Sequence, residues 1–130
     1  MTDLATRIEQ ATGPDRVIDA EIWTLIIDLS DPDINEPVFR HIVSRILAGG
    51  NDGECPAYTA SIDAAMTLVG NDFWLELKGP RKYLNIPSPV PNYWSASVDD
   101  WNHEGHAMGW GSTPALALCA AALRAREAKP

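Results

Sequence analysis

Apolar residues in the first 50 positions recur every three or four residues, which is the spacing of amphipathic helices. The expected apolar faces are Leu4 with Ile8, then Ile18, Ile22, Leu25, Ile26 and Leu29, then Phe39, Ile42, Val43, Ile46 and Leu47. Gly13-Pro14, Pro32 and the run "GGNDG" separate these segments, because glycine and proline interrupt helices. The pattern therefore predicts three helices within residues 1–50.

Two further helices are expected in the second part of the chain. The segment "PAYTASIDAAMTLVGND" predicts a helix with Thr59 or Ser61 as its cap. Its expected inward residues are Ile62, Ala65, Met66 and Val69. The segment "STPALALCAAALRAREAK" predicts a helix that begins at Pro114, after a cap at Ser112 or Thr113. Its expected core residues are Leu116, Cys119, Ala120 and Leu123.

Between these two helices the hydrophobicity alternates, which is typical of strands with one buried face. In "FWLELKG" the apolar side is Phe73, Leu75 and Leu77, and the other side is Trp74, Glu76 and Lys78. "YWSASVDD" and "HAMGWG" predict two further strands that form an antiparallel hairpin around "WNHEG". Trp94, Ala96 and Val98 are expected together on the core side. The proline-rich "PRKYLNIPSPVPN" predicts a loop before this hairpin.

These elements predict a single α+β domain over residues 1–130. A unit of α-β-β-β-α order, residues 57–128, holds a three-stranded antiparallel sheet, and N-terminal helices in residues 1–50 precede it. We expect two helices on one face of the sheet. The other face is then either open or covered by the N-terminal helices.

The composition of the chain limits the classes of partner that we expect it to bind. The net charge of −8 repels phosphates and disfavours a nucleic acid duplex as ligand. The last helix begins with "GSTPALAL", without the cations that double-stranded RNA-binding modules place there. Neither of the two cysteines sits in a CxxC pair, no signal peptide opens the chain, and no apolar run approaches membrane-spanning length. We therefore expect a cytoplasmic protein without a membrane partner or a cofactor.

The helices on either side of the strands also carry a family pattern. "PAYTASIDAAMTLV", then tryptophan-containing strands, then "STPALALCAAALRARE" resembles the phage ABA sandwich family of small prophage proteins. The opening "RIEQATGPDRVIDAEIW" is similar to the start of uncharacterised proteins from alphaproteobacterial prophages, and helix 36–48 would be an insertion. The resemblance implies an αβα-type fold and a mobile-element source. It transfers no catalytic residue to this chain.

Aromatic and basic side chains gather in the strand region and form the candidate ligand-binding set. Its members are Trp74, Lys78, Arg81, Lys82, Tyr83, Tyr93, Trp94, Trp101, His103, His106 and Trp110. Aromatic rings can stack on a base, and lysine or arginine can hold a phosphate. Alternation assigns part of this set to the core. The residues expected on the open face, Trp74, Tyr93, Ser95 and Ser97, would form either a binding surface or a homodimer interface.

The stretch "DDWNHEGHAMGW" has two interpretations, as a metal site or as the tip of a hairpin. Asp99, His103 and His106 could contribute to a metal-dependent hydrolase, but zinc needs three or four converging ligands. "HEGH" lacks the i, i+4 histidine spacing of helical zinc sites, and Asn102 with Gly105 supplies turn chemistry. The two histidines are therefore expected at the rim of a binding surface.

The expected function follows from the resemblance, the small acidic chain and the aromatic set. It is that of a non-enzymatic phage accessory protein that binds and neutralises a host target, as an inhibitor of a bacterial anti-phage defence system. The target would be a nucleotide-type signal or a defence protein with a basic surface. Two alternatives stay open: a small metal-dependent hydrolase using the Asp99, His103 and His106 cluster, and a dimeric interaction module.

Overall fold

The computed structural model describes residues 2–27, 29–50, 53–69, 73–81, 93–100 and 107–128. Its elements are α1 (Thr2–Gln10), α2 (Arg16–Ile26), α3 (Glu36–Leu47), α4 (Ile62–Met66), β1 (Phe73–Arg81), β2 (Tyr93–Asp100), β3 (Ala107–Gly111) and α5 (Pro114–Ala128). The strands form one antiparallel sheet in the order β1-β2-β3. The predicted α+β fold, with α-β-β-β-α order after N-terminal helices, is confirmed.

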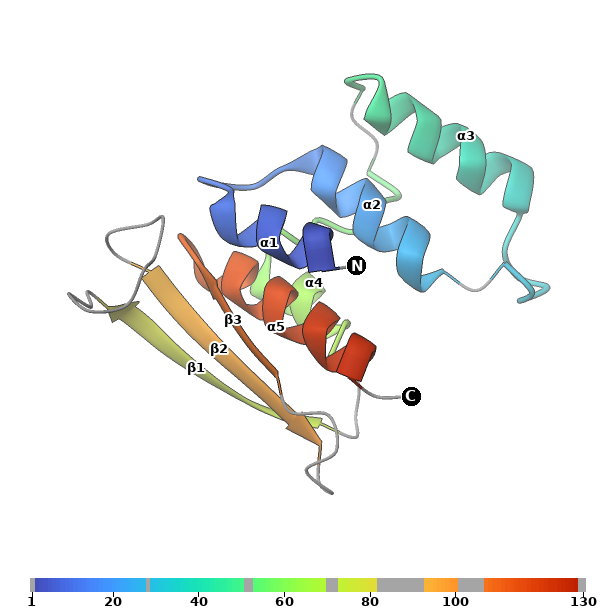
Figure 1. Cartoon of the computed structure of the whole chain (residues 1–130). Coiled ribbons are helices and arrows are strands. Elements are labelled where there is room, and N and C mark those ends of the chain that lie inside the picture. Colours follow the sequence, from blue (N-terminus) through green and yellow to red (C-terminus); the bar gives the residue numbers. More distant parts are fainter. Residues whose placement is uncertain are drawn as a thin grey trace.

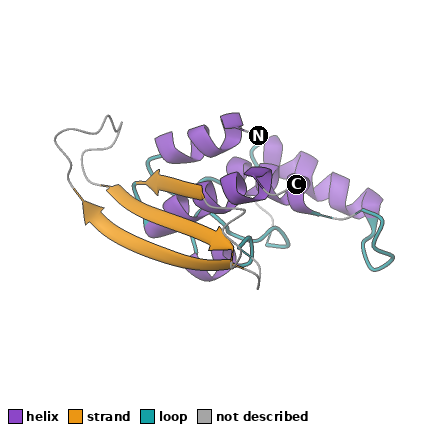
Figure 2. Ribbon diagram, turned by 60° about the horizontal axis from the view of Figure 1, so that its bottom comes forward, coloured by secondary structure: helices purple, strands orange, loops and turns teal. Residues whose placement is uncertain are grey.

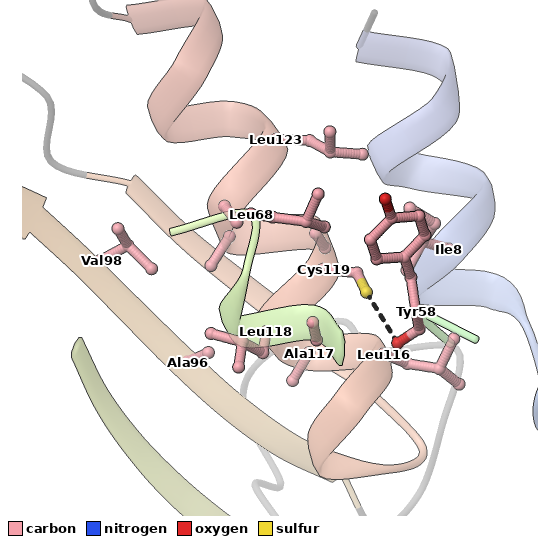
Figure 3. Packing of buried hydrophobic residues seen from close by; sticks show 14 of the residues in the cluster. Ile8, Tyr58, Leu68, Ala96, Val98, Leu116, Ala117, Leu118, Cys119 and Leu123 are labelled. Atoms are coloured by element: carbon pink, nitrogen blue, oxygen red, sulfur yellow. Dashed lines mark hydrogen bonds between the residues drawn. The ribbon is translucent and has the colours of Figure 1, made fainter. Parts of the chain in front are cut away.

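The helix α5 is the centre of the molecule (Figure 1). Every residue from Ala115 to Leu123 is buried, because the sheet covers one side of the helix while α1 and α4 pack against other sides. Figure 3 shows leucines of α5 among Ile8 of α1, Tyr58, and Val98 of β2. A helix enclosed in this way needs apolar residues around its whole circumference, which explains its alanine- and leucine-rich sequence.

Glycines allow α5 to lie directly against the backbone of β3. A Cβ atom added at Gly109 would stand 2.4 Å from the backbone nitrogen of Ala121 and 2.6 Å from the carbonyl oxygen of Ala117. A Cβ at Gly111 would stand 2.7 Å from the backbone nitrogen of Ala117. These distances leave no room for a side chain, so the two glycines set the separation between helix and sheet.

The N-terminal helices lie on the side of the sheet that α5 covers (Figures 1 and 2). The helix α1 packs against α5 and β3, and α2 packs against α3, which lies farther from the sheet. The contacts of α4 are mainly with α5, so α5 alone covers most of the sheet, rather than the expected pair of helices. On the opposite face Trp74, Lys78 and Met108 are exposed, which agrees with the open alternative.

The helix α2 is shorter than its apolar stripe predicted. Asp15 caps it by accepting the N–H groups of Val17 and Ile18, at 2.9 and 3.3 Å. It ends at Ile26, because Ile27 adopts an extended backbone with φ −69° and ψ 135°. The stripe therefore does not continue to Leu29 as part of this helix.

The helix α4 is also shorter than expected, and this changes which residues face the core. Ser61, one of the two predicted caps, accepts the N–H of Ala64 at 3.3 Å. The helix ends at Met66, and turns follow it. The prediction that Ile62 and Met66 face inward is wrong, since both are exposed, whereas Leu68 is buried. Helical spacing cannot assign inward positions beyond the point where the helix ends.

None of the helices in the described part of the chain combines the length and the apolar character that crossing a bilayer requires.

Candidate functional site

The uncovered face of the sheet brings together side chains from all three strands. We call this set the open face: Trp74, Glu76 and Lys78 of β1, Ser95, Ser97 and Asp99 of β2, and Met108 and Trp110 of β3. The strand register arranges them in rows. One row is Lys78–Ser95–Trp110, and the next is Glu76–Ser97–Met108.

Two large apolar side chains lie on opposite strands of the open face. Trp74 is 38% exposed and Met108 is 42% exposed. Burial of an aromatic or methionine side chain is normally favourable, so this exposed apolar surface is available to a partner. On β2, Asp99 lies opposite Trp74, and Ser97 lies opposite Met108. Large apolar side chains exposed on one face of a sheet can mark a protein-binding surface.

A hollow of about 120 Å³ lies on the open face. It is lined by Glu76, Lys78, Ser95, Ala96, Ser97 and Met108. Pockets for small molecules and cofactors usually enclose about 300–1,000 Å³. The hollow can therefore take one side chain of a partner, and it is too small to enclose a nucleotide.

An ion pair lies on the open face. The ammonium group of Lys78 lies 2.9 Å from the carboxylate of Glu76 on the same strand, and both side chains are about half exposed. Such an ion pair between half-exposed side chains contributes little to stability in water. Lys78, one cation of the predicted cluster with Arg81 and Lys82, is therefore paired with Glu76 in the structure.

Trp94 is not part of the open face, which corrects its assignment to the ligand-binding set. It points to the core side with Ala96 and Val98, is partly buried, and packs against the main hydrophobic cluster. Its ring covers Gly79 of the neighbouring strand: a Cβ at Gly79 would stand 2.4 Å from the ring carbon Cε3. The alternative that placed Trp94 in the core is confirmed.

The other members of the predicted set divide into two groups. Trp110 is half-buried on the open face, and its backbone N–H donates to Glu9 of α1 at 3.1 Å. Arg81 and Tyr93 face one another in the strand register, and the description covers their backbones alone. The remaining predictions, Lys82, Tyr83, Trp101, His103 and His106, lie outside the described residues.

The predicted metal cluster is described at one position. Asp99 is buried near the end of β2 and lies opposite Trp74 in the register, while His103 and His106 fall outside the described ranges. Within those ranges, no three side chains of histidine, cysteine, aspartate or glutamate come together to hold a metal ion. The metal hypothesis thus depends on residues beyond them.

Cys119 does not have the properties of a nucleophile. It is fully buried on α5, and its thiol donates to the carbonyl oxygen of Tyr58 at 3.2 Å (Figure 3). Burial, reinforced by the charge of Asp19, raises the pKa of Cys119 from 9.0 to about 12. A reactive cysteine needs a lowered pKa, because the thiolate is the attacking form. The prediction of a structural role for Cys119 is confirmed.

A buried polar cluster was missed by the sequence reasoning. Asp19 of α2 has no exposed surface. Its carboxylate accepts both the backbone N–H and the hydroxyl of Thr59, each at 2.8 Å, and pairs with Arg16 at 2.9 Å. Arg16 in turn donates to the carbonyl oxygen of Cys55 at 2.9 Å. The cluster ties α2 to the segment before α4. Its signal in the sequence was a carboxylate directly beside the apolar Ile18.

A second hollow, of about 450 Å³, lies between α1, α2 and α3. It is lined by Leu4, Arg7, Glu21, Thr24, Leu25, Val43 and Leu47. The ion pair between Arg7 and Glu21, at 2.8 Å, stands among these residues. Leu25 and Leu47 were predicted as core, but they are 47% and 50% exposed. The two helices contact each other through other residues, so these leucines line a groove instead.

Comparison with known proteins does not add to this geometry. Neither a scan against protein-family models nor searches of curated proteins and of solved structures found a match to the chain. The resemblance to the phage family stays a prediction, and the geometry of the open face is the basis for a functional proposal.

Proposed function

We propose that this protein is a non-enzymatic phage accessory protein that inhibits a bacterial anti-phage defence system by binding one of its proteins. The open face of the sheet would be the binding surface. The observation that carries the proposal is the exposure of Trp74 and Met108 on a face that the described helices leave uncovered. Aromatic and methionine side chains are enriched in protein interfaces, where a few such residues supply most of the affinity.

A protein target is favoured over a nucleotide signal. The hollow on the open face, about 120 Å³, accommodates a side chain of a partner, and Lys78 is already paired with Glu76. The net charge of −8 also attracts a basic protein surface and accelerates the encounter with it.

Plaque assays test the proposal. The chain is expressed in bacterial strains that each carry one defence system, and the plating efficiency of a sensitive phage is measured. We expect plaques to return in at least one strain. A variant with Trp74→Ser and Met108→Ser should lose this effect, because the two apolar anchors are removed.

The matched control is Val38→Ser on α3, which removes an apolar side chain of similar exposure away from the sheet. It should restore plaques as well as the unaltered protein does. Restoration that survives the double substitution on the open face would contradict the proposed surface. Absence of restoration in every strain would contradict the proposed function.

Calorimetric titration with a panel of nucleotides separates the two kinds of target. We expect no saturable heat. Saturable binding that Trp74→Ser abolishes would replace the protein target with a nucleotide ligand.

A further inference from the structure

One of the two outer edges of the sheet is closed by side chains. On β3 the N–H of Trp110 donates to the carboxylate of Glu9 at 3.1 Å, and Arg124 donates to the carbonyl oxygen of Met108 at 3.1 Å. Glu9 and Arg124 also bind each other through two hydrogen bonds, one of them 2.7 Å long. This clasp satisfies backbone groups that would otherwise pair with another strand.

The hydrogen bonds of the clasp, together with the strand register, also show which backbone groups of β1 point to the outer edge of the sheet. Neighbouring residues of a strand direct their N–H and C=O groups to opposite edges. The backbone N–H and C=O groups of Trp110 and Met108 point away from β2. Because Ser95 and Ser97 lie opposite these two residues, their own backbone groups point toward β1. They pair with Lys78 and Glu76. Phe73, Leu75 and Leu77, in the regular part of β1 before the register irregularity that follows Lys78, therefore direct their N–H and C=O groups to the outer edge.

In the part of the chain that the structure describes, β1 pairs with β2 and ends the sheet. Leu75 and Leu77 are half-buried, although both pack against the main core. Among the described residues no clasp like that on β3 closes this edge, and an edge strand with half-buried leucines can be a template for another strand. Lys78, Pro80 and the register irregularity after Lys78 confine the regular part of this edge to the residues before it. The contrast with the clasped edge of β3 makes β1 the edge that is available for pairing.

We propose that β1 pairs with β1 of a second copy of this chain, antiparallel and centred on Leu77, to form a continuous six-stranded sheet. This inference concerns the edge of the sheet and does not depend on the proposed function. In this register Leu77 faces the partner's Leu77, and Glu76 faces the partner's Lys78. Symmetry repeats the pair of opposite charges on the other side of the centre.

The charge pattern selects the second copy and the register. Glu76 and Lys78 flank Leu77 on the open face, so antiparallel pairing about Leu77 places unlike charges directly opposite each other. Pairing about Glu76 or about Lys78 would oppose like charges. Pairing about Leu75 would place Glu76 opposite the partner's Trp74. The sequence of β1 is thus complementary to itself in one register.

Charge reversal tests the proposed interface. Sedimentation velocity of the full chain should give a particle of twice 14.2 kDa. Glu76→Lys alone opposes two positive charges, and Lys78→Glu alone opposes two negative charges, so each single variant should be monomeric at the same concentration. The two variants mixed together should form a dimer, because each then offers the charges that the other needs. The double variant should also dimerise.

The control is Glu36→Lys on α3, which reverses an exposed charge of another ion pair with Arg40. It should leave the dimer intact, and circular dichroism should show that all variants are folded. A monomeric wild-type chain would overturn the proposal. A dimer that both single reversals leave unchanged would place the contact elsewhere and overturn it as well, as would single variants that stay monomeric when mixed.

Discussion

The two sides of this molecule are packed in different ways. Around α5, alanine and glycine residues bring backbone against backbone, and buried side chains fill every direction. Between α2 and α3 the contact is smaller. It consists of Trp23 against the edge of Phe39, with ring centroids 4.6 Å apart, and of a small cluster around Ile46.

The two regions should therefore differ in how well they tolerate substitutions. Where backbones touch, a single added methyl group has no space to occupy, and the packing around it cannot yield without moving an element. Where side chains meet across a groove, neighbouring positions can change size at little cost. The first region should therefore determine global stability, and the second should admit local opening.

The largest effect is expected at the cluster that joins the two regions. Asp19→Ala removes the acceptor for the N–H and hydroxyl of Thr59 and leaves Arg16 without its carboxylate. Breaking a buried charged pair on one side costs about 3–5 kcal/mol. Urea unfolding followed by circular dichroism measures this loss. Asp33→Ala, at an exposed position, should change the free energy of unfolding by less than about 0.5 kcal/mol.

Gly109→Ala should lower the free energy of unfolding by a smaller but still measurable amount. The new methyl group would overlap the backbone of α5, and overpacking of this kind costs about 1–3 kcal/mol. Gly13→Ala is the matched control, since a Cβ there meets no atom within 4 Å. Equal thermal stability of the two variants would show that the contact between α5 and β3 is looser than described.

The third largest effect is expected from alkaline pH, which should lower the stability of the region around α5. Burial raises the pKa of Cys119 from 9.0 to about 12 and that of Tyr58 from 10.0 to about 12. The unfolded chain loses these protons first, so the stabilisation is complete below pH 9 and is lost as pH rises toward 12. By pH 10 the loss from the thiol is on the order of 1 kcal/mol. Urea unfolding at pH 8 and pH 10 checks this, and Cys119→Ala should flatten the decline.

The smallest effect is expected on the α2–α3 side. Leu47→Ala shortens a side chain that is half exposed in the groove, so the free energy of unfolding should change by less than about 0.5 kcal/mol. Amide hydrogen exchange sharpens the comparison. Amides of α3 should exchange through local opening, and those of α5 only through global unfolding. Equally slow exchange in both helices would remove the distinction.

The sequence predicted the parts of the fold that repeat a regular pattern. Alternation placed Leu75 and Leu77 toward the core and Trp74 and Lys78 outward, as the structure has them. It did not predict which stripe residues find a partner. Leu25 lies on a correct helical stripe, yet no neighbouring helix covers it, because burial depends on where α3 docks.

The candidate site was predicted less completely. Trp74, Ser95 and Ser97 could be assigned from alternation, but the positions of Met108 and Trp110 needed the strand register, which opposes them to Ser97 and Ser95. Asp19 was missed, since its partner Thr59 lies 40 positions away. Contacts between residues so far apart in sequence follow from tertiary packing, and no local pattern contains them.

The clasp between Glu9 and Arg124 has a consequence for synthesis of the chain. Its two members are 115 positions apart, so Glu9 is translated long before the arginine that it binds. Until α5 emerges, the sheet lacks the helix that packs against it, and the clasp on its outer edge cannot form. We expect the nascent protein to fold as a unit only after α5 has emerged, with its strand edges open until then.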